Sequence, residues 1–187
     1  MNPIEDTQAW LEAAVIGLNL CPFAKTVHAK GQIRWVESRA TQPRELLGDL
    51  VAELRALDAA DPEAVDTTLL VCPQVLQDFL DFNDFLDVAD GALEDLGLEG
   101  TLQIAAFHPQ FQFEGTEPDD PGNFSNRSPH PTLHLLREAS LDRAVEAFPE
   151  AETIYERNIA TLRGLTPAQW QAVFGPRAPR QPGTGEG

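Results

Sequence analysis

Strand-like segments alternate with helical segments through the first three quarters of this chain, and that alternation restricts the fold more than any other feature. Short stretches rich in β-branched, aromatic or leucine residues predict strands at 32–36, 67–72, 102–107 and 132–137. Leucine stripes at helical spacing predict helices at 41–57 and 75–96. The pattern predicts an α/β fold with a single mixed sheet of about four strands and right-handed crossover helices.

Additional helices are expected at both ends of the chain. At the N-terminal end they cover residues 4–20 and 22–29, and after the last strand they cover 140–148, 151–162 and 167–174, with Ser140 and Thr166 as N-caps. Residues 1–175 therefore read as one domain. The segment 176–187 carries proline, glycine and arginine without apolar anchors, which predicts a disordered tail.

Charge narrows the choice of partners. The 187 residues hold 30 acidic and 13 basic side chains, a formal net charge of −17. Such a surface repels nucleic-acid backbones and anionic membranes, so neither is expected as a partner. No apolar run approaches the length of a membrane span, and the N-terminal residues lack the basic start of a secretory signal. We expect a cytoplasmic protein with Cys21 and Cys72 reduced.

The first candidate for chemistry is Cys21, which Pro22 follows. A proline favours the first turn of a helix, so Cys21 is expected at an N-cap position. The positive end of the helix dipole would favour the thiolate there, which makes Cys21 a candidate catalytic nucleophile. The alternative is that Cys21 is a small packing residue.

Three histidines, His108, His130 and His134, flank an irregular, proline-rich stretch at residues 108–131. Loops of that length inside compact domains are usually functional or disordered. A histidine titrates near neutral pH, so His108 and His134 are candidates for catalytic acid or base. A metal site of histidines and carboxylates is a third alternative, although the spacing matches no recognised metal motif.

Arginines are few in this acidic chain, and several stand among small hydrogen-bonding residues. Arginine recognises carboxylate and phosphate groups through paired hydrogen bonds. These residues are therefore expected to bind a small anion, unless the arginines pair with the excess of acidic side chains. The candidate ligand-binding residues are Asn126, Arg127, Ser128, Arg137, Arg157 and Asn158.

The combination of these segments resembles an uncharacterised bacterial family, the domain of unknown function 1415. The resemblance rests on the stretches 18–24, 107–113, 126–138 and 156–158, so it spans nearly the whole chain apart from the tail. It implies that Cys21, His108, Arg127, His134 and Arg137 belong to the pattern of the family. It implies no reaction, and His130 falls at an unspecified position.

Two functions are consistent with these residues. The first is an enzyme acting on a small anionic metabolite, with Arg127 and Arg137 holding the charge, His108 or His134 as acid or base, and Cys21 as nucleophile. The second is a non-catalytic accessory protein whose loop 108–131 binds a ligand or a partner. A single pocket lined by these side chains would favour the enzyme. An exposed aromatic surface around Phe111, Phe113 and Phe124 would favour the accessory protein. The sequence identifies no cofactor and leaves the oligomeric state open.

Overall fold

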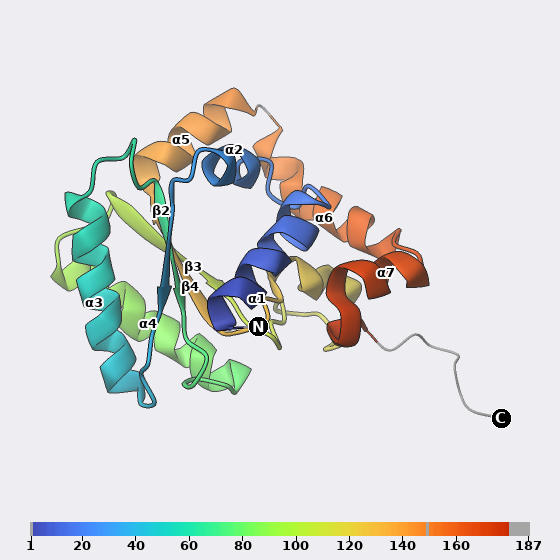
Figure 1. Ribbon diagram of the computed structural model, residues 1–187, viewed down its shortest axis with the longest axis horizontal. Coiled ribbons are helices and arrows are strands. Elements are labelled where there is room, and N and C mark those ends of the chain that lie inside the picture. Colours follow the sequence, from blue (N-terminus) through green and yellow to red (C-terminus); the bar gives the residue numbers. More distant parts are fainter. Residues whose placement is uncertain (1, 149, 180–187) are drawn as a thin grey trace.

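A four-stranded mixed sheet forms the centre of the computed structural model, which describes residues 2–148 and 150–179 (Figure 1). The strands are β1 (Ile33–Glu37), β2 (Thr67–Val71), β3 (Leu102–Phe107) and β4 (Thr132–Arg137). The predicted α/β class with a single mixed sheet is confirmed. Both β3 and β4 begin and end where the sequence predicted.

The order of the strands, β1-β2-β4-β3, was not predictable from the sequence. β1 pairs with β2 in parallel, whereas β4 runs antiparallel to both of its neighbours. The first three strands therefore point the same way, and the last strand is inserted between β2 and β3. Residues aligned across the sheet share one face, so His134 lies on the same face as its partners Leu69 and Ala105.

Helices α3 (Pro43–Ala59) and α4 (Phe79–Asp95) cover one face of the sheet (Figure 1). In α3, Leu46, Leu50, Leu54 and Leu57 of the predicted stripe are completely buried, and Leu47 is partly buried against them. Asp78 caps α4 by accepting hydrogen bonds from two backbone N–H groups of its first turn. These helices and the facing strand residues form the larger of two apolar cores.

The opposite face carries the N-terminal helices and a second apolar core, which includes Trp10, Phe124 and Trp170. Where the sequence predicted one helix over 4–20, α1 (Pro3–Trp10) changes into a π-helix, η1 (Leu11–Ile16). π-Helical turns are rare and often occur at functional sites. The segment ends with Asn19 in the left-handed conformation, at φ 53°.

Of the remaining helices, α2 (Ala24–Ala29) precedes β1 and η2 (Pro121–Asn126) lies in the loop before β4. Those that follow β4 are α5 (Glu138–Ala147), η3 (Ala151–Thr153), α6 (Ile154–Arg163), α7 (Pro167–Phe174) and η4 (Gly175–Arg177). Thr166 caps α7 as predicted, but Ser140 lies inside α5, where its hydroxyl donates to Asp66. No described helix is long and apolar enough to cross a membrane.

The predicted tail falls partly outside the described residues, which end at 179. Its first residues differ from the prediction, because η4 is ordered against the domain. The Arg177 guanidinium donates to the Arg127 carbonyl oxygen at 3.3 Å, and Ala178 packs on the second core. Contacts from another part of the chain thus order a segment whose own composition favours disorder. Residues 180–187 lie outside the described part of the structure.

Candidate functional site

The sheet separates His108 and His134, the two candidates for the acid or base of a single pocket. His108 follows β3 and lies on the face covered by α4, where its ring packs against Phe79 and Phe82 at centroid distances of 5.4 and 4.9 Å. His134 lies in the middle of β4 on the opposite face and stacks on Phe107 at 5.8 Å. The fold therefore does not bring His108 and His134 into one pocket.

Both ring nitrogens of His108 are bonded to the backbone. Nδ1 accepts a hydrogen bond from the Gln110 N–H at 3.0 Å, which leaves the ring proton on Nε2. Nε2 then donates to the Leu76 carbonyl oxygen at 3.0 Å. Leu76 has a φ of 56°, an unfavourable conformation for a leucine that this hydrogen bond helps to hold. Burial lowers the pKa of His108, so the ring is neutral at pH 7.

Burial also lowers the pKa of His134, to about 4. The ring is therefore neutral at physiological pH and sits beside an aromatic ring on a largely apolar sheet face. A base needs a pKa near the working pH to be effective, and a value of about 4 makes His134 a weak one. The acid or base roles of both histidines stay predictions.

The loop 108–131 is held together from inside by polar side chains. The Arg127 guanidinium donates from Nε to the Phe111 carbonyl oxygen at 2.9 Å and from Nη2 to that of Pro118, and it lies 4.6 Å from the Phe124 ring centroid. Asn126 donates to the Ala106 carbonyl oxygen at 3.2 Å. Ser128 is buried, and its hydroxyl donates within the loop at 2.6 Å. These bonds explain how a long irregular segment stays ordered.

Arg137 lies at the far end of β4, and its side chain caps α3. Its Nη2 donates to the carbonyl oxygens of Leu57, Ala60 and Val65 at 2.8, 3.1 and 2.9 Å. Those groups lie at or just beyond the C-terminal end of a helix whose last turn contains no basic residue. The guanidinium therefore donates to carbonyl oxygens that have no partner within the helix, and its positive charge lies at the negative end of the helix dipole. Five residue steps along β4, roughly 17 Å, separate Arg137 from Thr132, which pairs with Phe107 next to His108.

Cys21 does not cap a helix, because α2 begins at Ala24 with Phe23 at its N-cap. Its carbonyl oxygen accepts the Ala24 N–H at 3.2 Å in the turn that precedes this short helix. The side chain is partly buried and packs against the second core. The prediction of an N-cap thiol was wrong by two residues, since Pro22 occupies the turn rather than the first helical position.

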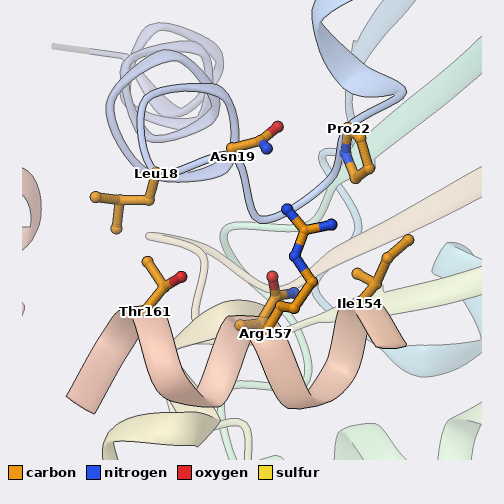
Figure 2. A pocket seen from close by; sticks show the side chains of 7 residues that line it. Leu18, Asn19, Pro22, Ile154, Arg157 and Thr161 are labelled. Carbon is orange, nitrogen blue, oxygen red and sulfur yellow. The ribbon is translucent and has the colours of Figure 1, made fainter. Parts of the chain in front are cut away.

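Two of the candidate residues, Arg157 and Asn158, do line a cavity. It measures about 210 Å³ and lies between α6 and the loop that follows η1. The loop contributes Leu18, Asn19 and Pro22. Helix α6 contributes Ile154, Arg157, Asn158 and Thr161. We call this cavity the Arg157 pocket; Figure 2 shows the guanidinium reaching from α6 toward the loop between Asn19 and Pro22.

Contacts on both sides hold the Arg157 pocket in place. Asn158 donates from Nδ2 to the Leu20 carbonyl oxygen at 2.8 Å, which ties α6 to the loop. The Arg157 guanidinium lies 5.5 Å from the ring centroid of Phe148, and that ring packs edge-to-face on Phe23. Within the described residues Arg157 forms no ion pair, although acidic residues outnumber basic ones more than twofold.

The sequence interpretation missed two polar residues of this pocket, Asn19 and Thr161. The position of Asn19 carried a signal, because asparagine often ends a helix in the left-handed conformation. Thr161 stands one turn after Arg157 on α6, and only the tertiary contact with the loop distinguishes it from a surface threonine. In residues 2–148 and 150–179, no group of three or more His, Cys, Asp or Glu side chains could hold a metal ion. His130 pairs instead with Asp6 at 3.1 Å.

Comparison with known proteins identifies one match. A search of curated proteins found none, and a search of solved structures found none. A family model described as a protein of unknown function (DUF1415) matches residues 2–172, which include both walls of the Arg157 pocket and the whole sheet. Since the match covers most of the chain, this protein belongs to the DUF1415 family.

Proposed function

We propose that this protein binds a small anionic molecule in the Arg157 pocket. The observation that carries the proposal is a guanidinium without an ion-pair partner among the described residues, held at a cavity whose other polar groups are amides and a hydroxyl. Guanidinium, amide and hydroxyl groups can all donate hydrogen bonds to carboxylate or phosphate oxygens. Asn158 already uses Nδ2 for the loop, so the donors are expected to be Arg157, Asn19 and Thr161.

The size of the cavity limits the ligand. Pockets for drug-sized molecules measure about 300–1,000 Å³, and the Arg157 pocket at about 210 Å³ is smaller. It suits a phosphate-sized anion or a short carboxylate. The net charge of −17 repels anions at long range, so selectivity depends on the local cation rather than on the field of the whole protein.

The chemistry of the lining favours binding over catalysis. The seven lining side chains include no histidine, acid, lysine or cysteine. General acid–base and nucleophilic catalysis need such groups within hydrogen-bond reach of the substrate. Of the two functions consistent with the sequence, the non-catalytic binding protein is therefore the better supported.

A thermal-shift titration tests the proposal. The probes are sodium phosphate and sodium succinate, with sodium chloride at matched ionic strength as the reference. We expect either anion to raise the Tm of the wild type, because a ligand at 100 times its Kd stabilises a fold by about 2.7 kcal/mol. Arg157→Gln should abolish that rise. Arg55→Gln, an exposed arginine on α3 with the same change of charge, should retain it.

Two results would overturn the proposal. One is a wild-type Tm that neither phosphate nor succinate raises beyond the sodium chloride reference. The other is an equal rise in wild type and Arg157→Gln, which would show that the anions act by exclusion from the protein surface rather than in the pocket.

A further inference from the structure

A second cavity lies between the N-terminal end of α4 and the loop 108–131. It measures about 390 Å³, within the range of pockets that enclose small organic ligands. Its apolar wall is formed by Phe79, Leu80, Pro109 and Pro118. Its polar lining comprises Asp78, Gln110, Gln112 and Arg127. We call it the Asp78–Arg127 pocket.

The two charged groups of this pocket are opposite in sign, yet they form no ion pair with each other in the part of the chain that the structure describes. Each is held by other contacts. Asp78 uses Oδ1 to cap α4, which leaves Oδ2 for a ligand. Arg127 uses Nε and Nη2 to bind loop carbonyls, which leaves the N–H groups of Nη1. A carboxylate and a guanidinium are thus fixed at separate points of one cavity.

The aromatic wall is also held in place. The Phe79 ring packs on His108 at 5.4 Å and on Phe111 at 5.3 Å. Since both ring nitrogens of His108 are bonded to the backbone, Phe79 rests on a rigid support. Leu80, which also lines the pocket, is 71% exposed, more than any other large apolar side chain in the part of the chain that the structure describes. A ligand that covered it would remove apolar area from water.

We propose that the Asp78–Arg127 pocket binds a small zwitterion with an apolar group, of the chemical class of the apolar α-amino acids. The ligand's ammonium group pairs with Asp78 and its carboxylate with Arg127, while its side chain lies against Phe79 and Leu80. A molecule with only one of these charges leaves the other protein charge unpaired. Specificity for the zwitterion therefore follows from the two fixed charges.

Isothermal titration calorimetry with L-phenylalanine and L-leucine tests this site, with 3-phenylpropionate and phenethylamine as analogues that each carry a single charge. Loss of one charge-assisted hydrogen bond costs about 1.5–3 kcal/mol, which corresponds to roughly tenfold to a hundredfold in Kd. We expect at least one amino acid to bind and both analogues to bind at least about tenfold more weakly.

Asp78→Asn is the decisive variant, because asparagine also caps helices but carries no charge. It should weaken amino-acid binding about tenfold or more and leave the binding of 3-phenylpropionate unchanged. Asp81→Asn makes the same change of charge one turn further along α4, outside the pocket lining, and should bind like the wild type. Arg157→Gln should also bind like the wild type, which separates this site from the anion site.

Side-chain amide signals provide a second measurement. The NH₂ resonances of Gln110 and Gln112 should shift in NMR spectra when L-phenylalanine or L-leucine is added to the wild type. The proposal is overturned if neither amino acid binds, if the single-charge analogues bind equally well, or if Asp78→Asn and Asp81→Asn have the same effect.

Discussion

Two adjacent threonines of β2, Thr67 and Thr68, provide a direct measure of what an unpartnered hydroxyl costs inside this protein. Both are buried, but only one is hydrogen-bonded. Thr67 Oγ1 donates to the Leu135 carbonyl oxygen at 2.6 Å. Thr68 Oγ1 is fully buried and has no hydrogen-bond partner among the residues that the structure describes; it lies on the face shared with Leu70 and the larger apolar core. We predict that replacing Thr68 by valine raises the stability, whereas replacing Thr67 by valine does not.

The magnitudes follow from the two environments. A buried hydroxyl without a partner costs about 1–3 kcal/mol, and a methyl group in its place adds roughly 0.8 kcal/mol of apolar burial. Thr68→Val should therefore raise the free energy of unfolding by about 1–2 kcal/mol after allowance for imperfect packing. Thr67→Val loses a hydrogen bond with a net contribution of about 0.5–1.5 kcal/mol, so it should lower that free energy or leave it nearly unchanged.

Urea unfolding followed by circular dichroism measures both free energies. Valine and threonine are both β-branched, so strand propensity changes little and the m-values should match that of the wild type. In a thermal scan, 1 kcal/mol corresponds to about 2–4 °C for a domain of this size. If Thr68→Val is destabilised as much as Thr67→Val, then Thr68 has a partner in solution and the reasoning fails.

Four further predictions concern the described contacts. Arg137→Gln should lower the free energy of unfolding by about 3 kcal/mol, because three carbonyl oxygens lose a charged donor; a loss below about 0.5 kcal/mol in urea unfolding would contradict this capping role. Gly17→Ala should lower the Tm by several degrees, since a Cβ there would lie 2.3 Å from a backbone oxygen, and an unchanged Tm would show that η1 relaxes freely. Between pH 6.5 and pH 4, His134 is protonated in the unfolded chain but stays neutral in the folded protein, so the free energy of unfolding should decrease by up to about 3 kcal/mol as the pH falls. His134→Phe should reduce this dependence of stability on pH, and an unchanged dependence would refute the low pKa. Iodoacetamide should label Cys21 in the folded protein but Cys72 only after unfolding, because burial raises the pKa of Cys72 to about 12; mass spectrometry of the native protein detects either outcome.

The candidate residues could be named from the sequence, but their grouping could not. Arginine, histidine and asparagine side chains are recognisable by type, whereas their partners depend on which distant segments the fold brings together. Arg137 and Arg157 look alike in the sequence as arginines of an acidic chain. In the fold one is buried against three carbonyl oxygens of another segment, and the other reaches into a cavity. Asp78, Gln110 and Gln112 carried no signal, because the pocket they share exists only where α4 meets the loop.

Local patterns determined the class of fold and nearly every element. A period of two or of 3.6 residues is a property of the chain itself, so β3, β4 and the leucine stripe of α3 were visible before folding. The insertion of β4 between β2 and β3 was decided only in three dimensions, because strand order depends on which edges meet. The register of β4 against its neighbours places His134 on the same face as Leu69 and Ala105, since register sets the direction of every side chain in a sheet. Sequence thus determined the elements and the chemical types of the candidate residues, and tertiary packing decided which of them became structural supports and which came to line a pocket.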